Sequence, residues 1–134
     1  MKLKLSLTKN GEVVFEMPLS MEDWTKRHLA SELTSAEQEF EKFSRLFDAL
    51  SHETRLKMMK RLLEDEDRTL GFGDFMHDLR LNPKTVWENT RKLQEGGLLV
   101  KSKDGKYRFS GSGVAEFLML SLALRGLFKA TEEL

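Results

Sequence analysis

The sequence predicts a mainly α-helical protein with a small amount of β-structure. Between residues 20 and 95, apolar side chains recur at the three- and four-residue spacing of amphipathic helices, and helix-capping residues separate the segments. Two shorter segments, residues 1–19 and 98–110, instead place strand-like flanks around an Asn-Gly or Asp-Gly turn, which is typical of β-hairpins. A final segment, residues 114–131, is again helical and strongly apolar.

Length and composition limit what the chain can be. Its 134 residues are enough for a domain with a single core, and the absence of cysteine excludes disulfides and thiolate metal sites. The most apolar stretch, FLMLSLALRGLF, is too short to span a bilayer and contains Arg125. The N-terminus lacks the long apolar run of a signal peptide. We therefore expect a cytoplasmic protein with no membrane partner.

Charge is distributed unevenly, although 22 bases balance 22 acids overall. Residues 12–41 contain eight acids and only two bases, whereas residues 83–110 contain seven bases and three acids. A basic segment within a neutral chain can attract nucleic acid to one face, because the local charge determines the field there.

Residues 1–19 are predicted to form an N-terminal β-hairpin extension. If Asn10-Gly11 alone formed a two-residue turn, Leu5 would face Glu16 across the hairpin. A three-residue loop with Gly11 in the left-handed conformation places the apolar residues on one face instead, so this register is favoured. The predicted pairs are Leu7 with Val13, Leu5 with Phe15 and Leu3 with Met17.

Residues 20–134 are predicted to form one domain that begins with helices. Ser20 starts a helix with a sequence similar to a capping box, and a second capping box, residues 34–37, starts another. Ser51 is the expected cap of a third helix, and a short helix is expected over residues 72–80. The apolar positions of the second helix are Phe40, Phe43, Phe47 and Leu50.

Asn82-Pro83 is a strong helix start, since asparagine caps well and proline suits the first helical position. This helix is predicted to cover residues 83–95 and to end at Gly96-Gly97, before the hairpin of residues 98–110. A short helix, a tight turn, a second helix and a hairpin in this order form a winged helix-turn-helix. The predicted fold is therefore a winged helix-turn-helix domain preceded by an N-terminal β-hairpin.

Two segments carry a family resemblance. The first is LFDALSHETRL at residues 46–56, with an ALS-x-x-TRL pattern, and the second combines Thr85-Val86 with KLQEGGLL at residues 92–99. Through these segments, the region from Phe43 to about Leu120 resembles the ArsR-type winged-helix regulators of bacteria and archaea. They are similar to that family's helix-joining segment, its recognition helix and the turn into its wing. The N-terminal hairpin lies outside the resemblance.

The resemblance implies a dimer that binds operator DNA, with helices from residues 21–50 and 114–131 at the dimer interface. Thiol-sensing members carry cysteines where this chain has Gly71 and Gly73. Other members bind metal through histidines and carboxylates of the last helix, but the last helix of this chain has no histidine. The three histidines of the chain are scattered without metal-ligand spacing. We therefore expect no metal site and no cofactor.

The helix of residues 83–95 and the basic hairpin after it are the expected DNA-binding elements. Stepping about 100° per residue places Val86, Thr90 and Leu93 on the buried face of that helix. The opposite face is polar, as reading the major groove requires, and a basic hairpin can lie along the backbone or in the minor groove. The residues expected to contact double-stranded DNA are Lys84, Thr85, Trp87, Glu88, Arg91, Lys92, Lys101, Lys103, Lys106 and Arg108.

Three residues of this helix allow more than one interpretation. Trp87 either contacts a thymine methyl or sugar edges, or packs against the hairpin or the short helix. Glu88 lies four residues from two lysines, which softens its repulsion of phosphate, and a carboxylate can also accept from the cytosine amino group. Asn89 is a weak candidate for reading adenine, because it lies nearer the buried side.

The last helix is apolar over most of its circumference, so a small monomer has too little core to bury all of it. A symmetric homodimer is the favoured explanation, and the alternative is that the N-terminal hairpin covers its second side. The residues expected in the dimer interface are Phe40, Phe43, Phe117, Leu120, Leu124, Leu127 and Phe128.

The favoured function is that of a dimeric DNA-binding transcription regulator. The alternatives are a winged-helix module that binds protein and an architectural protein that binds DNA independently of sequence. An enzyme is not expected, because the sequence has no cysteine nucleophile, glycine-rich phosphate loop or metal-ligand cluster.

Overall fold

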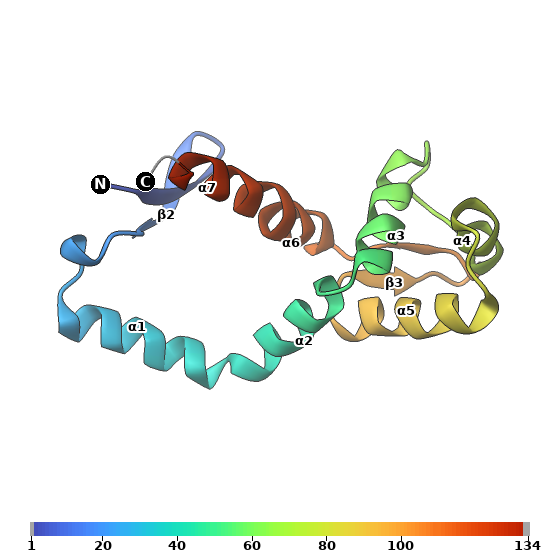
Figure 1. The fold of residues 1–134 in the computed structure, drawn as a ribbon, viewed down its shortest axis with the longest axis horizontal. Coiled ribbons are helices and arrows are strands. Elements are labelled where there is room, and N and C mark those ends of the chain that lie inside the picture. The colour runs from blue at the N-terminus through green and yellow to red at the C-terminus, as the bar shows by residue number, and fades with distance from the viewer. Residues whose placement is uncertain (1, 133–134) are drawn as a thin grey trace. The chain divides into compact units, whose positions relative to one another are not determined.

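The computed structural model describes residues 2–132, which are mostly helical with a small amount of β-structure (Figure 1). The chain divides into two compact units between Phe40 and Glu41. The boundary expected from the sequence lay between residues 19 and 20, whereas the structure groups a helix with the first hairpin. Within residues 2–132, no helix combines the length and the apolar character needed to cross a membrane.

The N-terminal unit consists of an antiparallel hairpin followed by helical segments. Strands β1 (Lys4–Lys9) and β2 (Glu12–Pro18) form the predicted hairpin, and a 3-10 turn (Met21–Asp23) and α1 (Lys26–Gln38) follow. Among residues 2–40, Ser20 alone is buried. The described part of this unit therefore encloses no apolar core of its own.

The register of the first hairpin differs from the predicted one. Asn10 and Gly11 form a two-residue turn, and both have the positive φ (51° and 83°) that a tight hairpin turn requires. A β-bulge next to Leu7 then shifts the pairing by one residue. The predicted three-residue loop was wrong, and the bulge is what brings Leu5 and Leu7 onto one face with apolar partners. The observed pairs are Leu5 with Met17, Leu7 with Phe15 and Thr8 with Val13.

Helix α1 runs through the segment at which a new helix was predicted. Its N-cap is Thr25, whose hydroxyl accepts a hydrogen bond from the His28 N–H (3.1 Å). The Thr34 and Ser35 hydroxyls donate to carbonyls four residues earlier, so they continue the helix and do not cap a new one. Ser20 makes no cap bond either, because its Oγ accepts from a backbone N–H of the hairpin (3.1 Å).

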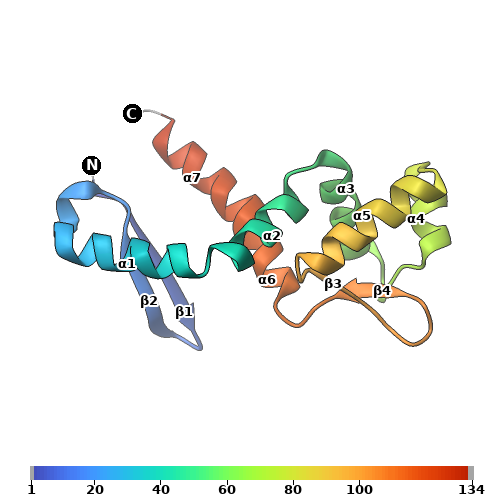
Figure 2. The same cartoon turned by 90° about the horizontal axis from the view of Figure 1, so that it is seen from below.

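The C-terminal unit contains the remaining helices and a second hairpin, and Figure 2 shows this hairpin below α5. Its last helix, expected over residues 114–131, continues from α6 through a π-helical stretch into α7. The elements are α2 (Phe40–Leu50), α3 (Glu53–Glu64), α4 (Phe72–Leu79), α5 (Pro83–Glu95), β3 (Leu99–Lys101), β4 (Tyr107–Phe109), α6 (Gly113–Leu118), the π-helical stretch (Met119–Ala123) and α7 (Leu124–Thr131).

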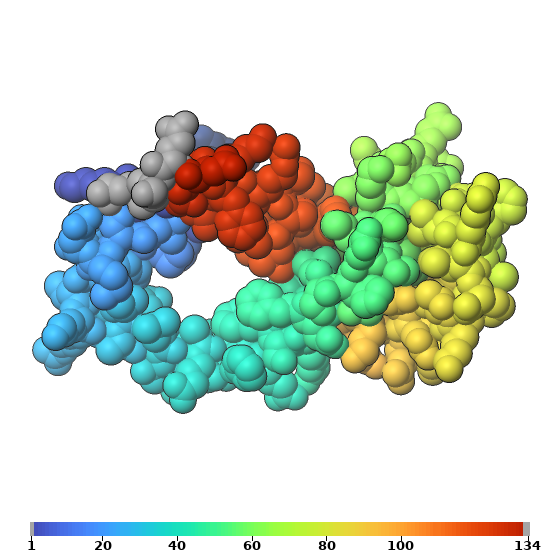
Figure 3. Space-filling view, viewed as in Figure 1, coloured from blue at the N-terminus to red at the C-terminus, as the bar shows by residue number. Residues whose placement is uncertain are grey.

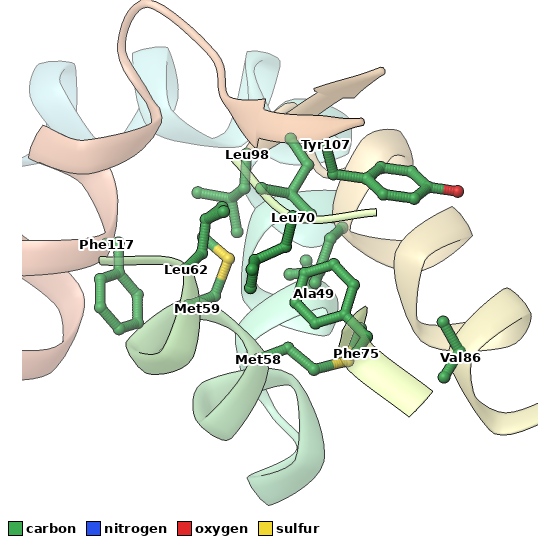
Figure 4. Packing of buried hydrophobic residues seen from close by; sticks show 12 residues of the cluster. Ala49, Met58, Met59, Leu62, Leu70, Phe75, Val86, Leu98, Tyr107 and Phe117 are labelled. Atoms are coloured by element: carbon green, nitrogen blue, oxygen red, sulfur yellow. The ribbon is translucent and has the colours of Figure 1, made fainter. Parts of the chain in front are cut away.

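The core of this unit lies between α3, α4, α5 and the second hairpin (Figure 4). The rings of Phe75 on α4 and Tyr107 on β4 lie 6.1 Å apart within it. Burying each large apolar side chain stabilises the fold by roughly 1.5–3 kcal/mol, which makes this core the main source of stability. Its members are Ala49, Met58, Met59, Leu62, Leu70, Phe75, Val86, Leu93, Leu98, Leu99, Tyr107 and Phe117.

A tight turn joins α4 to α5. Arg80 takes a left-handed backbone conformation (φ 53°), and the Leu81 N–H donates to the Met76 carbonyl (3.0 Å). Helix α5 then begins at Pro83 with Asn82 as its cap, which confirms the predicted start. The order of short helix, tight turn, helix and hairpin expected from the sequence is therefore present.

The second hairpin is joined to the helices at two places. Two backbone hydrogen bonds (2.7 and 3.1 Å) link Tyr107 of β4 to Leu70, just before α4. Gly96, between α5 and β3, allows close packing against α2, because a Cβ there would lie 2.6 Å from the Ala49 Cβ. The Gly96-Gly97 pair thus ends α5 and also makes room for the end of α2.

Helix α3 starts one residue later than predicted. His52 is its cap, with Nδ1 accepting from the Thr54 N–H (3.1 Å). The predicted cap, Ser51, was wrong, because its hydroxyl donates to the Asp48 carbonyl (2.8 Å) and so closes α2.

A buried arginine joins three helices of this unit. Arg55 of α3 is only 8% exposed, and its guanidinium donates to the carbonyls of Asp48 and Ala49 at the end of α2 (2.9 and 2.7 Å). Its third hydrogen bond goes to the side-chain oxygen of Asn89 on α5 (2.8 Å). Arg55 therefore satisfies two of the last carbonyls of α2 and fixes that helix against α3 and α5.

Replacing Arg55 with methionine should destabilise the protein by about 2–4 kcal/mol, because three acceptors lose a charged donor at once. Urea unfolding followed by circular dichroism would measure this as a lower midpoint with an unchanged slope. Arg61→Met is a matched control, since Arg61 pairs with Asp78 near the surface (2.9 Å) and its loss should cost less than about 1 kcal/mol. Equal losses in the two variants would contradict a special role for Arg55.

Candidate nucleic-acid interface

Helix α5 turns a defined face away from the core. The Asn82 side-chain oxygen accepts from the Thr85 N–H (2.8 Å) at the start of the helix. Val86, Thr90 and Leu93 are buried, which confirms the buried face predicted from the sequence. Thr90 is accommodated there because its hydroxyl donates to the Val86 carbonyl (2.8 Å). The exposed residues of α5 are Pro83, Lys84, Trp87, Glu88, Arg91, Gln94 and Glu95, while Thr85 and Lys92 are partly exposed.

Asn89 belongs to the buried face of α5 and is not available to read a base. Its side-chain oxygen accepts from Arg55, and its amide donates to the Thr85 carbonyl (2.8 Å). The sequence indicated the inward position of Asn89 but not its partner. Arg55 lies in the ALS-x-x-TRL segment that carries the family resemblance, but the pattern alone does not indicate this contact.

Two bases on the outer face of α5 each have an acidic partner one helical turn away. The Lys84 Nζ lies 3.9 Å from a Glu88 carboxylate oxygen, and the Arg91 Nε lies 3.7 Å from a Glu95 carboxylate oxygen. Of the two lysines expected to soften the charge of Glu88, Lys84 lies beside it, whereas Lys92 pairs with Asp48. These pairs leave little net charge on the middle of the outer face.

The third base of α5, Lys92, is bound to α2. Its ammonium donates to the Asp48 carboxylate across 2.9 Å. This hydrogen bond from Lys92 holds the pKa of the Asp48 carboxyl below its ordinary value. All three bases of α5 that were expected to contact DNA are thus paired with carboxylates.

Trp87 lies outside the core, with 56% of its surface exposed. The guanidinium carbon of Arg91 lies 4.9 Å from the centroid of its ring, which is a cation–π contact. The sequence left open whether Trp87 packs against the hairpin or the short helix, and the structure leaves more than half of its surface exposed.

His52, the cap of α3, and Thr54 of α3 lie on the same surface, although the sequence did not indicate them as site residues. Together with Thr85, Trp87 and Arg91 they line a shallow, open depression. His52 and Thr54 lie beside α5 because Arg55 is bonded to Asn89 of that helix, and no local sequence pattern indicates this contact.

The hairpin β3–β4 carries four exposed bases near its tip. The tip is ordered by Asp104, whose carboxylate accepts from the Ser102 hydroxyl (2.5 Å) and from the Lys106 N–H (3.0 Å). Those two hydrogen bonds hold the pKa of the Asp104 carboxyl below its ordinary value. One base, Lys101, also lies over the ring of Tyr107, with its Nζ 5.6 Å from the centroid. The four bases are Lys101, Lys103, Lys106 and Arg108.

The residues predicted for a dimer interface lie in different environments. Phe117 is 6% exposed and its ring lies 6.0 Å from that of Phe109, so it packs within its own unit. The first turns of the last helix pack on the core of their own unit. By contrast, Phe40 and Phe128 are each 64% exposed and Leu124 is 42% exposed (α7 is the reddest part of Figure 3). Phe43, Leu120 and Leu127 are partly exposed.

No protein-family model matches this chain, and no curated protein matches it. Within residues 2–132, no group of three histidine, cysteine or carboxylate side chains is placed to hold a metal ion.

The pKa of Asp104 should lie below the ordinary 3.8, and Ser102→Ala should raise it towards that value. A carboxyl whose pKa is lower in the folded protein than in the unfolded chain adds to the free energy of unfolding at a pH above the unfolded-chain value. This contribution is lost as the pH falls through the pKa of the folded state. An NMR titration of the Asp104 carboxyl carbon over the acidic range would measure the midpoint. Ser110→Ala, which removes a hydroxyl bound to the Gly97 carbonyl, should not move it. An unchanged midpoint in Ser102→Ala would contradict this prediction.

Proposed function

We propose that this protein is a dimeric DNA-binding transcription regulator with a winged helix-turn-helix fold. In this proposal α5 enters the major groove, and the β3–β4 hairpin is the wing that contacts the backbone or the minor groove. The observation that carries the proposal is the hairpin tip, where four exposed bases surround a turn ordered by Asp104. The ArsR-type resemblance of residues 43–120 supports the same function.

The dimensions of α5 suit a major groove. A helix with its side chains is about 10–12 Å across, and the groove is about 12 Å wide. The 13 residues of α5 begin at Pro83, and the exposed Lys84 and partly exposed Thr85 follow, with side chains that can reach a phosphate. The tight turn at Arg80 brings α4 close to the same end of α5, so a second helix can lie across the backbone.

The wing, rather than α5, supplies the attraction for phosphate in this proposal. Lys84, Arg91 and Lys92 are each paired with a carboxylate, whereas the four bases of the wing have only Asp104 among them. Each phosphate neutralised by a base contributes roughly 0.9 to the slope of log K against log salt. The salt dependence of DNA binding should therefore arise mainly from the wing.

A Lys103→Ala/Lys106→Ala variant should bind DNA more weakly and should reduce the salt slope by up to about 1.8 per subunit. Fluorescence-anisotropy titrations with a labelled duplex at several salt concentrations would measure both quantities. Lys57→Ala/Lys60→Ala is the matched control, because it removes two exposed lysines of α3 with the same change in net charge. If the two double variants behave alike, a contact specific to the wing is ruled out.

The choice of duplex separates a regulator from an architectural DNA binder. Tighter binding of the protein's own upstream region than of a scrambled duplex would support a regulator. Equal binding of both would support the architectural alternative. Absence of binding at low salt would overturn the DNA proposal.

The proposal also requires a second copy of the chain, so that two wings reach two half-sites. Large apolar side chains remain exposed on both α2 and the last helix. Small soluble monomers rarely expose so many large apolar side chains on two helices. A symmetric contact between these helices would cover them. The most exposed examples are Phe40 at 64%, Phe47 at 55%, Met119 at 51%, Leu122 at 58% and Phe128 at 64%.

A Phe47→Glu/Phe128→Glu variant should be monomeric, because it buries charge in the proposed contact, and it should lose at least about tenfold in DNA affinity. Sedimentation velocity would measure the mass, and the anisotropy titration would measure the affinity. Leu56→Glu is the control, since Leu56 of α3 is 44% exposed and lies outside the proposed contact. A wild-type protein that sediments as a monomer would contradict the dimer.

A second candidate is a winged-helix module that binds another protein. The observations that favour it are the exposed Trp87 and the paired charges of α5, because tryptophan and arginine are enriched where protein surfaces bind. The titrations above distinguish the two, since a protein-binding module shows no salt-dependent affinity for duplex DNA.

A further inference from the structure

We propose that Trp87 and Arg91 form the base-reading pair of α5 and select a thymine close to a guanine in the major groove. This inference rests on the proposed function and deepens it by naming the DNA sequence that is read. It starts from the stacked arrangement of the two side chains, with the Arg91 guanidinium carbon 4.9 Å from the centroid of an indole that is 56% exposed.

Arg91 is held on both sides along the helix. It stacks on Trp87 one turn earlier, and its Nε lies 3.7 Å from the Glu95 carboxylate one turn later. A guanidinium restricted in this way loses less side-chain entropy when it binds, and its planar fork matches the O6 and N7 acceptors of guanine. Guanine is therefore the base that Arg91 is arranged to read.

Trp87 supplies an apolar surface where most groove-facing side chains are polar. The apolar group that the major groove offers is the C5-methyl of thymine. Phosphate is a poor partner at this position, because the Glu88 carboxylate follows Trp87 directly and is only partly neutralised by Lys84 at 3.9 Å. The indole of Trp87 is therefore arranged to cover a thymine methyl.

The spacing of the two residues sets the spacing of the two bases. Four residues of an α-helix span about 6 Å along its axis, and base pairs are about 3.4 Å apart. The thymine and the guanine are accordingly in adjacent base pairs or separated by one.

Two other polar side chains of α5 are engaged within the protein. Asn89 is bonded to Arg55 inside the protein, and Lys92 is bonded to Asp48 of α2. Lys84 lies at the helix start, where it can reach a phosphate. Among the exposed side chains of α5, Trp87 and Arg91 are the two that contact each other as a cation–π pair, and base reading is therefore assigned to them.

The test is a double-mutant cycle between protein and DNA. A duplex is first selected from a random pool with the wild-type protein, and each thymine is then replaced in turn by deoxyuridine, which removes only the methyl group. At one position this replacement should weaken wild-type binding about fourfold, the value expected for one buried methyl group, and should leave Trp87→Ala unaffected. At a neighbouring guanine, 7-deazaguanine should weaken the wild type and leave Arg91→Met unaffected.

Two controls accompany the cycle. Trp87→Ala should keep the wild-type salt slope, because the wing is intact, and the urea midpoint should hardly change, because the indole is mostly exposed. Trp87→Phe, which keeps an aromatic surface, should retain part of the sensitivity to the thymine methyl.

The failures of the two proposals are distinguishable. If deoxyuridine weakens wild type and Trp87→Ala equally at every position, or if no sequence is enriched although duplexes bind at low salt, the reading pair is overturned and DNA binding by the wing stands. If the wild type binds no duplex even at low salt, the proposed function is overturned as well.

Discussion

The direction in which α5 faces depends on one buried side chain, Arg55. Its guanidinium bonds to the last carbonyls of α2 and to Asn89 of α5, so three helices are tied to a single group. A buried cation without partners costs several kcal/mol, and this cost makes any rotation of α5 that breaks the Asn89 bond unfavourable. Asn89 in turn donates to the Thr85 carbonyl, which carries the constraint to the first turns of α5. The outward direction of Trp87 is thus set from inside the protein.

Carboxylates of α2 and of α5 itself determine the charge of the outer face of α5. Asp48 forms an ion pair with Lys92, and Glu88 and Glu95 of α5 pair with the other two bases of that helix. The four bases at the tip of the hairpin keep their positive charge. For a protein that binds DNA, this arrangement separates two tasks. Attraction to phosphate is independent of sequence and weakens with salt, whereas base contacts at α5 depend on shape and on a few specific groups. A net charge of zero is then compatible with DNA binding, because the field is local.

Most of the fold could be predicted from the sequence because most of its elements obey local rules. Asn82-Pro83 starts a helix, and the three-to-four spacing of Val86, Thr90 and Leu93 gives its buried face, without reference to distant residues. The errors arose where two residues could each cap the same helix, or where contacts between distant residues decide the structure. Ser51 and His52 are both good caps, and only the bond of Ser51 to the end of α2 decides between them. The bulge in the first hairpin has no glycine to mark it. The site was predicted by residue type, but the pairing of Lys92 and the contact of Arg55 with Asn89, 34 residues away, required the structure.

The same constraint bears on how a short reading pair could select an operator. A thymine and a guanine recur too often in a genome to specify one site, so the proposed regulator needs two copies that read two half-sites at a fixed separation. That separation is a property of the dimer contact. Because Arg55 and Lys92 both bind the end of α2, any partner that holds the exposed face of α2 also holds α5. Repacking α2 against a second copy would therefore change the distance between two α5 helices, and with it the affinity for an operator, without altering a residue that touches DNA.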